Sequence, residues 1–401
     1  MWSWWRDMEM KTLGTVATYI NGRAFKPSEW EKTGMPIIRI QNLTSENAPY
    51  NYSKGIFEEK YIVHNGDLLF AWSASLGAHI WKGQDAWLNQ HIFKVLPKEG
   101  IDRDYLYYFL LAVVAELYAK THGSGMVHIT KAPFMNTPIP VPSLPEQQRI
   151  VSRIEELFSQ LDAGVETLKK TKAQLAVYRQ AVLKEAFEGR LTASGPEKIV
   201  RLGDYIETPR YGTSKKCSYG DGRDRTAVYR IPNIEHKNGR ISHDDIKYAQ
   251  FTESELDGIR LQQGDILIIR SNGSVSLVGR AAMVCDADIT GTFAGYLMRL
   301  RISEPETLLP KFLLLFLQSH QARIYIENKA KSTSGVHNIN STEISDLHLP
   351  LYDLDTQYAI IEAIESRLSV CDSIEQTVDT ALQQAEAMRQ SILKQAFGGA
   401  L

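Results

Sequence analysis

One long segment occurs twice in this chain, in the same register and 210 residues apart. Residues 150–191 and 360–401 align without a gap, and the two copies share the ending Arg-Gln-x-[Val/Ile]-Leu-Lys-x-Ala-Phe-x-Gly. Apolar residues recur at every third or fourth position in both copies, which predicts helices. A stretch of globular composition precedes each copy. The chain is therefore predicted to be built as two copies of one unit, and we expect its target to have two related halves.

The apolar positions of both helices fit a heptad repeat sustained for about six heptads, which is a coiled-coil signal. Because the second copy carries the same pattern, each helix is the natural partner of the other. The predicted coiled-coil seam contains Val151, Ile154, Phe158, Leu161, Val165, Leu168, Leu175 and Val182 in the first copy, with Ile361, Ile364, Leu368, Cys371, Val378, Leu382 and Ile392 in the second.

Polar residues interrupt this seam at Lys172, Arg179, Glu375 and Arg389. Two interpretations remain open from the sequence. Polar groups buried in a seam can fix register and orientation at a cost in stability. Alternatively, the long side chains pass the seam and reach water with their charged ends. Both helices end in Phe-x-Gly, and a glycine is the usual residue at a helix stop.

The two globular stretches share their landmarks in the same order. Each has a Gly-Asp turn before an apolar strand, an apolar helix, and an extended segment with proline before the long helix. The corresponding segments are Pro36–Leu43 and Val228–Ile234, Asn65–Phe70 and Gln263–Ile268, Asp104–Lys120 and Pro310–Asn328, Ser124–Ile129 and Ser334–Ile339, and Pro138–Pro142 and Leu347–Pro350.

This order predicts an α+β protein with two mixed α/β domains separated by two long helices. The boundaries that we assign are 1–141 for the first globular domain, 142–191 for the first helix, 192–349 for the second domain and 350–401 for the second helix. The domains differ in their loops. Arg210–Lys216 and Arg270–Ser274 have no equal in the first domain, which has Trp72–Ser75 instead. A shared scaffold with divergent loops is expected of two domains that recognise different targets.

Charge and composition limit the possible classes of protein. The net charge is −2 and the hydrophobic content is 43%, as in soluble globular proteins. The first three segments each carry a charge of +1 and the last one carries −5. No segment is basic enough to hold DNA by phosphate neutralisation alone. No apolar run is long enough for a membrane span, and the N-terminus does not resemble a secretory signal.

Motifs for catalysis are absent from the sequence. It contains no GxGxxG, GxxxxGK[ST], HExxH or GxSxG, and it lacks the Asn/Asp-Pro-Pro-aromatic loop of amino methyltransferases. Cys217, Cys285 and Cys371 have no metal-ligand spacing and fit a reducing cytoplasm. We therefore expect no catalytic residues, no metal and no cofactor on this chain.

The loops are instead rich in side chains that contact base edges and phosphates. In the first domain the candidate DNA-binding residues are Arg23, Lys26, Trp72, Ser73, Ser75, His79, Gln90, His91, His122, Ser124, His128 and Lys131. In the second domain they form three sequence clusters: Arg210, Tyr211, Lys215 and Lys216; Arg270, Asn272 and Ser274; and Lys331, Ser332, His337, Asn338 and Asn340.

This arrangement resembles the DNA-specificity (S) subunit of type I restriction-modification enzymes. The resemblance covers essentially the whole chain. It rests on the duplicated helix endings, on the Gly-Asp-x-Leu strands and Ser-Gly-x-x-x-Ile segments, and on Pro142–Ile150, which is similar to the proline-rich, Glu-Gln-containing start of the family's central helix.

The resemblance implies a division of labour. Each globular domain would be a target-recognition domain for one half of a bipartite DNA site, and the two helices would pair antiparallel as a spacer, about a pseudo-two-fold. Two modification (M) subunits would bind S-adenosylmethionine and methylate adenine N6. Restriction (R) subunits, where present, would add ATP-driven translocation and cleavage. The complex would be cytoplasmic, without a membrane partner.

The spacer role also follows from length. A helix of about 42 residues is roughly 63 Å long, a little under two turns of B-DNA at about 34–36 Å each. Whole heptads inserted near Leu168 are therefore expected to lengthen the gap between half-sites. The chain departs from the family pattern at Pro350–Gln357, which lacks Pro-Glu-Gln, so M-subunit docking is less secure there. The terminal tails that some relatives carry are also expected to be minimal in this chain.

A different class of protein remains as the alternative. In this alternative, the chain is a coiled-coil adaptor or scaffold whose globular domains bind protein. Salt-sensitive DNA affinity that depends on sequence would distinguish a DNA-binding subunit from such an adaptor.

Overall fold

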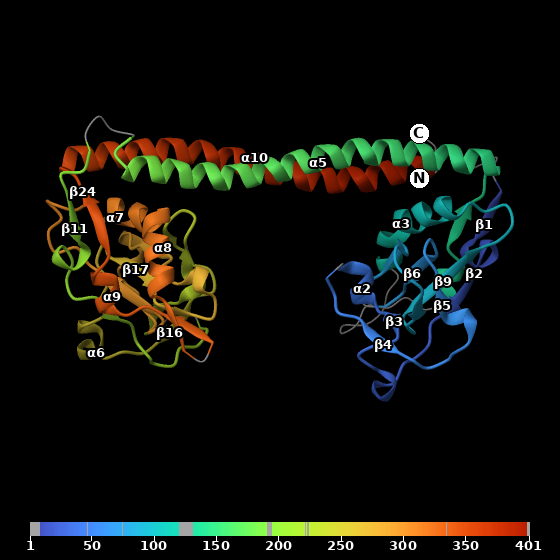
Figure 1. Cartoon of the computed structure of the whole chain (residues 1–401), viewed down its shortest axis with the longest axis horizontal. Helices are drawn as coiled ribbons and strands as arrows, with labels where there is room; N and C mark the ends of the chain where they lie inside the picture. Colours follow the sequence, from blue (N-terminus) through green and yellow to red (C-terminus); the bar gives the residue numbers. More distant parts are fainter. Residues whose placement is uncertain are drawn as a thin grey trace. The chain divides into compact units, whose positions relative to one another are not determined.

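The computed structural model describes residues 9–45, 47–73, 75–119, 131–190, 195–220, 222, 224–333 and 335–398. The chain forms two compact units: residues 1–169 with 379–401 are the first unit, and residues 170–378 are the second (Figure 1). Both unit boundaries fall inside long helices, at positions that correspond to within one residue in the internal repeat. Each unit thus contains one globular domain and a part of both long helices.

The globular domain of the first unit is built on two four-stranded sheets. One has the order β2 (Ala17–Asn21), β9 (Ile92–Pro97), β6 (Leu68–Ala71) and β7 (Gly77–Ile80); the other has β4 (Asn51–Ser53), β3 (Met35–Ile38), β8 (Ala86–Leu88) and β5 (Ile62–Val63). A separate pair joins β1 (Met10–Thr12) to β10 (Pro138–Pro140). The helices are α1 (Leu13–Val16), α2 (Ile40–Thr44), α3 (Arg103–Ala119) and α4 (Lys131–Met135), with 3-10 turns η2 (Pro27–Glu29) and η3 (Glu59–Tyr61).

The second unit repeats this plan. Its main sheet has the order β12 (Arg210–Tyr211), β21 (Leu297–Leu300), β17 (Ile266–Ile269) and β19 (Ala281–Met283), and a second sheet has β16 (Lys247–Ala249), β13 (Thr226–Tyr229) and β20 (Thr292–Phe293). Smaller sheets are β14 (Ile234–Glu235) with β15 (Arg240–Ile241), β11 (Lys198–Arg201) with β24 (His348–Leu351), and β18 (Ser271–Asn272), β23 (Val336–Asn338) and β22 (Lys331–Thr333). Its helices are α6 (Glu253–Asp257), α7 (Pro310–Leu317), α8 (His320–Lys329) and α9 (Ser341–Ser345), with η4 (Leu202–Asp204), η5 (Ile231–Asn233), η6 (Val275–Leu277) and η7 (Asp286–Asp288).

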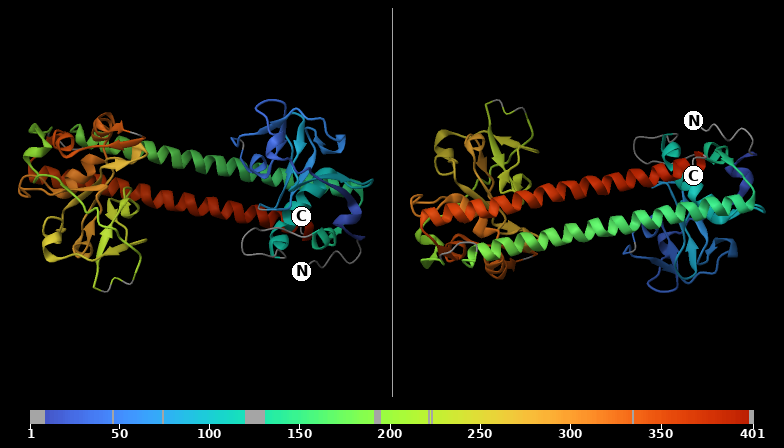
Figure 2. Two further views of the ribbon diagram at one scale, coloured as in Figure 1. Left: turned by 90° about the horizontal axis from the view of Figure 1, so that it is seen from below. Right: turned by 90° about the horizontal axis from the view of Figure 1, so that it is seen from above.

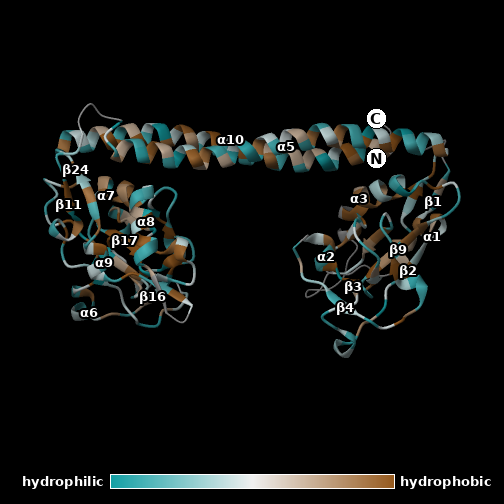
Figure 3. Ribbon diagram, in the orientation of Figure 1, coloured by the Kyte–Doolittle hydropathy of each residue, from teal (hydrophilic) through white to brown (hydrophobic). Residues whose placement is uncertain are grey.

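The predicted landmarks correspond in the two folds, with one correction. Strands β6 and β17, which follow the Gly-Asp turns, are buried along their whole length, and both proline-bearing exits are strands. The single apolar helix expected at 310–328 is wrong, because α7 ends at Leu317 and α8 begins at His320. The reason is a cap: the Ser319 side chain accepts a hydrogen bond from the backbone N–H of Ala322, which starts a new helix. Apolar residues gather inside each domain and on α3 and α7 (Figure 3).

The two long helices, α5 (Leu144–Phe187) and α10 (Leu354–Gly398), run alongside each other within each unit (Figures 1 and 2). In the first unit Arg389 of α10 pairs with Asp162 of α5, and its guanidinium carbon lies 4.6 Å from the centroid of the Phe158 ring. In the second unit Arg179 of α5 lies 3.1 Å from Glu375 and 2.5 Å from Asp372 of α10. These contacts confirm that the helices pair antiparallel.

Burial along the helices follows the heptad pattern. The seam residues Val151, Ile154, Phe158, Val182, Ile364, Cys371, Val378 and Ile392 are buried, and Leu161, Val165, Leu168, Leu175, Ile361, Leu368 and Leu382 are half-buried. Of the polar seam residues, Arg179 and Glu375 are bonded across the seam, and Arg389 is bonded to α5. The ion pairs therefore support the interpretation in which polar seam residues fix register.

Two repeated contacts attach each long helix to a globular domain. At the end of α10, the Phe397 ring contacts Tyr105 and Phe109 of α3, with ring centroids 5.3 Å apart in both cases. At the end of α5, the Phe187 ring contacts Phe312 and Phe316 of α7, again at 5.3 Å. The repeated Ala-Phe ending is therefore buried against the apolar helix of each unit.

Candidate nucleic-acid interface

In the second unit, two of the predicted clusters lie together at the edge of the main sheet where its loops begin. Arg270, which follows β17, places its guanidinium carbon 4.4 Å from the centroid of the Tyr211 ring on β12. Its backbone N–H donates to Tyr296 O at 2.9 Å, and its Nη1 donates to Gly295 O at 3.2 Å. Tyr211 and Tyr296 are 41% and 63% exposed, so this edge presents aromatic and cationic groups to solvent.

The small sheet of β18, β23 and β22 adds the third predicted cluster to the same place. Asn272 pairs with His337, and the strand register also places Ser332 opposite His337 and Lys331 opposite Asn338. His337 Nδ1 lies 3.2 Å from Ala330 O. The buried Oδ1 of Asn338 has no hydrogen-bond partner among the described residues, which leaves an acceptor for a ligand or water.

Other predicted residues of the second unit have partners within the protein or lie apart. Lys215 Nζ is 2.8 Å from both carboxylate oxygens of Glu255. Asn340 caps α9 by accepting from the backbone N–H of Glu343 at 2.9 Å. The Ser274 hydroxyl lies 3.0 Å from that of Ser276. Arg210 and Lys216 are exposed.

In the first unit, Trp72 and His91 form the corresponding surface. Trp72 Nε1 donates to Asn21 Oδ1 at 3.0 Å, its backbone N–H donates to His91 O at 3.2 Å, and its ring contacts the His91 ring. Gln90 Nε2 lies 3.2 Å from His91 Nε2. The buried Nδ1 of His91 has no partner among the described residues.

These two surfaces occupy the same backbone positions. Trp72 and Arg270 each follow the central strand and each donate to the carbonyl of a residue before the next strand, His91 or Tyr296. Gly22 and Gly212 each lie close to a backbone carbonyl. A Cβ at Gly22 would lie 2.0 Å from Asn89 O, and one at Gly212 would lie 2.2 Å from Phe293 O, so both positions require glycine.

Two positions in the segments that were expected to have no equal, Tyr211 and Arg270, therefore do have counterparts in the first domain. Asn21 corresponds to Tyr211, Trp72 to Arg270, and His91 to Tyr296. At these positions the backbone is common and the side chains differ. Asn21 and Tyr296 were missed by sequence reasoning, although the matched Asn-Gly and Tyr-Gly pairs were a signal for the first.

A hollow of about 280 Å³ lies beside His91 and contributes further polar groups. Its lining includes Gln90, Arg39 and Gln41, and Arg39 places its guanidinium carbon 5.6 Å from the centroid of the Trp30 ring. Arg39 and Gln41 were not among the predicted residues. They follow β3 in the same way that Arg230 follows β13.

Arg23 has a structural role within the first unit. It forms two hydrogen bonds with Glu29, at 3.0 and 2.5 Å, and its guanidinium carbon lies 4.0 Å from the centroid of the Phe57 ring. These hydrogen bonds raise the pKa of Arg23 and lower that of Glu29 to about 2. Arg23 is thus already paired within its own domain.

The remaining predicted residues of the first unit differ in their exposure to solvent. Lys26, Ser75 and Lys131 are exposed, Ser73 is buried, and burial lowers the pKa of His79. His122, Ser124 and His128 lie outside the described residues. Among the described residues, the structure therefore brings Trp72, Gln90 and His91 together.

No arrangement for metal chemistry is found among the described residues. They contain no group of three or more His, Cys, Asp or Glu that could hold a metal ion. Cys217, Cys285 and Cys371 are free thiols. Within the same residues, no helix is long and apolar enough to cross a membrane.

Comparison with known proteins gives one consistent result. Residues 6–176 match the family described as the type I restriction modification DNA specificity domain. The chain is 27% identical to the specificity subunit of the type I restriction enzyme EcoBI of Escherichia coli, over 97% of this chain and 85% of the relative. The chain is thus similar to the specificity subunits of type I restriction enzymes over nearly its whole length.

Further members of the specificity family match at similar length. The StySPI specificity subunit of Salmonella potsdam is 26% identical over 97% of this chain and 88% of its own length. The MjaVIII specificity subunit of Methanocaldococcus jannaschii is 23% identical over 90% and 86%.

Two solved structures share the family fold. A chain from a study of complex assembly and conformational transition of the type I R-M system has a TM-score of 0.73 at 19% identity, covering 98% of both chains. The HsdS subunit from Thermoanaerobacter tengcongensis has a TM-score of 0.51 at 18% identity, covering 99% of this chain and 98% of the other.

Proposed function

We propose that this chain is the non-catalytic, sequence-specific DNA-binding subunit of a type I restriction-modification complex. One observation carries the proposal: equivalent backbone positions in the two units hold Asn21, Trp72 and His91 in one and Tyr211, Arg270 and Tyr296 in the other. A duplicated scaffold with different polar and aromatic side chains at the same edge suits the recognition of two different half-sites.

The chemistry of the two surfaces suits direct contact with bases. Arginine donates to the O6 and N7 atoms of guanine, and asparagine forms paired hydrogen bonds with adenine. In the second unit, Arg270 and Asn272 would supply such contacts, with His337 beside them. In the first unit, Gln90 and His91 present polar groups next to the Trp72 ring. The two half-sites would accordingly differ in base sequence.

Catalysis would belong to partner subunits. Two modification subunits with S-adenosylmethionine would methylate adenine N6, and restriction subunits with ATP, where present, would translocate and cleave the DNA. The complex would work in the cytoplasm. The support for this division is the similarity to type I specificity subunits together with the absence of catalytic motifs from the sequence. A protein that supplies specificity alone needs neither cofactor.

The paired helices would set the gap between the half-sites. Both α5 and α10 contribute residues to both units, so any change in their length changes the connection between the two recognition surfaces. The antiparallel ion pairs at Arg179 and Arg389 support this role, because they hold the two helices in one register.

The experiment that tests the proposal is the co-expression of this chain with the methyltransferase subunit encoded beside it. Methylated adenines are then mapped in the host DNA by single-molecule sequencing. We expect one bipartite motif with one modified adenine in each half. If an active methyltransferase partner yields no motif that depends on this chain, the DNA-binding proposal is wrong and the adaptor function takes its place.

A further inference from the structure

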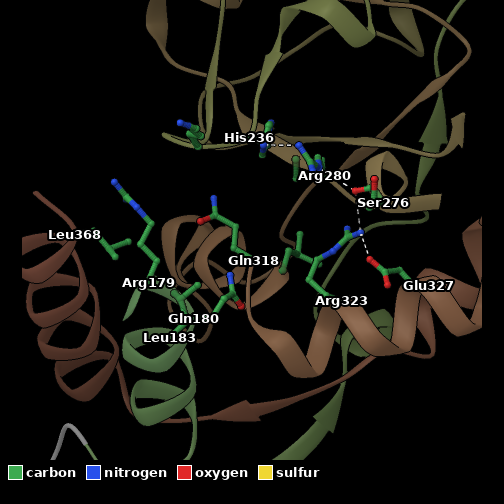
Figure 4. Close-up of a pocket in the computed structure, with 14 residues that line it drawn as sticks. Arg179, Gln180, Leu183, His236, Ser276, Arg280, Gln318, Arg323, Glu327 and Leu368 are labelled. Atoms are coloured by element: carbon green, nitrogen blue, oxygen red, sulfur yellow. Dashed lines mark hydrogen bonds and ion pairs between the residues drawn. The ribbon is translucent and has the colours of Figure 1, made fainter. Parts of the chain in front are cut away.

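A basic hollow of about 290 Å³ lies within the second unit, between the long helices and the globular domain (Figure 4). Arg179 of α5, Lys237, Arg280 and Arg323 of α8 line it, together with His236 and a single carboxylate, Glu327. Arg179 is paired with Asp372 and Glu375, and Lys237 Nζ lies 2.7 Å from Glu375. Arg323 forms an ion pair with Glu327, so the charge without a carboxylate partner is that of Arg280.

Arg280 and Arg323 both donate a hydrogen bond to the same carbonyl oxygen, that of Ser276. Arg280 Nε donates to Ser276 O at 2.9 Å, and Arg323 Nη2 donates to the same oxygen at 3.2 Å. Arg323 also donates to Val278 O and forms an ion pair with Glu327 at 2.8 Å. Two guanidinium groups are thus brought together, and the single carboxylate of Glu327 balances only one of their two charges.

Arg280 has no carboxylate partner among the described residues. Its Nη1 bonds to His236 Nε2, which can accept only from a neutral ring. Burial and the neighbouring Arg280 lower the pKa of His236, in agreement with that neutral form. Arg280 therefore keeps its full positive charge and further N–H donors for a ligand.

The loop that forms one wall of the hollow also carries recognition residues. Asn272 and Ser274 lie at its start, Ser276 and Arg280 lie further along, and the hydroxyls of Ser274 and Ser276 are 3.0 Å apart. Four residues of extended chain span at most about 14 Å. Asn272 therefore lies within about 14 Å of Ser276 at the wall of the hollow, a distance comparable with the width of the major groove, about 12 Å.

The corresponding hollow of the first unit has the opposite character. It measures about 560 Å³ and contains the repeated residue Arg389, but Glu155, Asp162 and Glu386 also line it, with Tyr107 and Tyr108. The basic hollow is therefore not a consequence of the duplicated scaffold. Among the described residues, its cationic lining comes from the second unit.

We propose that the hollow at Arg280 and Arg323 binds a phosphate of the DNA backbone next to the half-site recognised by the second unit. Paired arginines are well suited to phosphate, because the guanidinium fork matches its oxygens. The inference rests on the proposed DNA-binding function. It predicts an electrostatic contact that contributes affinity without contributing base preference.

The test uses the complex of this chain with its methyltransferase partner and DNA that carries the mapped motif. Binding is measured over a range of KCl concentrations for the wild type, Arg280→Gln and Arg280→Lys. We expect Arg280→Gln to reduce the slope of log K against log salt by about 0.9, the value for one lost phosphate contact, and Arg280→Lys to restore much of it. Base preference should stay the same.

The control variant is Lys98→Gln, which removes an exposed charge at the end of β9 remote from His91 and should leave the slope unchanged. An unchanged slope for Arg280→Gln, with motif-dependent binding intact in the wild type, overturns this inference alone. A loss of methyltransferase affinity in place of a slope change assigns the hollow to a partner carboxylate and also overturns it. Without motif-dependent binding by the wild type, the proposed function itself fails.

Discussion

Gln147 and Gln357 make the same three hydrogen bonds in their respective units, and neither side chain is exposed to solvent. Gln147 accepts from the backbone N–H of Asp102 and donates to the carbonyls of Gly100 and Pro142. Gln357 accepts from Leu309 and donates to Thr307 and Tyr352, at 2.9, 2.8 and 2.7 Å. Each glutamine joins the start of a long helix to the segment before the apolar helix of its domain.

The second long helix departs from the family pattern at its start, where M-subunit docking was expected to be less secure. The start of α10 lacks Pro-Glu-Gln but keeps Gln357. Because that glutamine is fully buried, it serves the internal structure and is not accessible to a partner subunit.

The glutamine bonds can be tested by replacing Gln147 with leucine. The change leaves the Asp102 N–H and the Gly100 and Pro142 carbonyls without their partner, which is expected to lower the free energy of unfolding by about 3 kcal/mol. Urea denaturation followed by circular dichroism measures the loss. Gln148→Leu, at the adjacent exposed position, is the matched control and should have little effect. Equal effects of both variants would contradict this account.

The phenylalanines at the helix ends should stabilise one unit each. Truncating a buried phenylalanine to alanine costs about 3–5 kcal/mol. Phe397→Ala should accelerate amide hydrogen exchange in α3, and Phe187→Ala should do so in α7, because those helices provide the ring contacts. Hydrogen-exchange mass spectrometry measures both. Met388→Ala, at a residue that is 55% exposed, is the control. Identical exchange patterns for the two phenylalanine variants would refute the assignment.

The Arg23–Glu29 pair predicts a dependence of stability on pH. The hydrogen bond from Arg23 holds the pKa of Glu29 at about 2, below its usual value of 4.5. A lowered folded-state pKa means that the pair stabilises the fold above about pH 4.5 and that this contribution is lost as the pH falls towards 2. Thermal unfolding across that range should show a shallower acid dependence in Glu29→Gln. Glu59→Gln removes an exposed carboxylate as a control. Parallel pH profiles of Glu29→Gln and the wild type would show that the pair contributes nothing.

The helices can be tested as a spacer by inserting one heptad after Leu168 and a matched heptad after Val378. Both insertions fall at the boundary between the units and keep the seam in phase. The methylated motif should keep both half-sites and gain a longer gap. A control insertion of three residues at each point breaks the heptad phase and should impair binding. An unchanged gap after the heptad insertions would disprove the spacer role.

The helical scaffold could be predicted from the sequence because burial in a paired helix follows a strict period. The repeated Ala-Phe endings and the heptad positions made both long helices visible without any tertiary knowledge. The break between α7 and α8 was missed, because the apolar run continues past Leu317 and the effect of Ser319 depends on a local cap. The apolar pattern alone does not distinguish one helix from two.

The recognition surface was only partly predictable, since residue type does not reveal the partner of a side chain. Arg23, Lys215 and Asn340 have the chemistry of DNA contacts, but the first two are paired with glutamates and the third caps a helix. Trp72 and Arg270 share a backbone position that no residue identity indicates. Only the strand pairing shows that correspondence.

The central claim is that each unit recognises one half of a bipartite DNA site. The most direct measurement is the methylated motif in cells that carry the methyltransferase partner with the wild type, Trp72→Ala or Arg270→Ala. Removing a base contact costs about 1–3 kcal/mol of discrimination. Arg270→Ala removes a proposed contact and Trp72→Ala removes the ring that packs against His91, so each variant should relax or lose one half of the motif and leave the other half unchanged. His348→Ala, an exposed change on β24, should leave both halves intact. If Trp72→Ala and Arg270→Ala alter the same half, or if the wild-type motif is a single continuous site, the account is wrong.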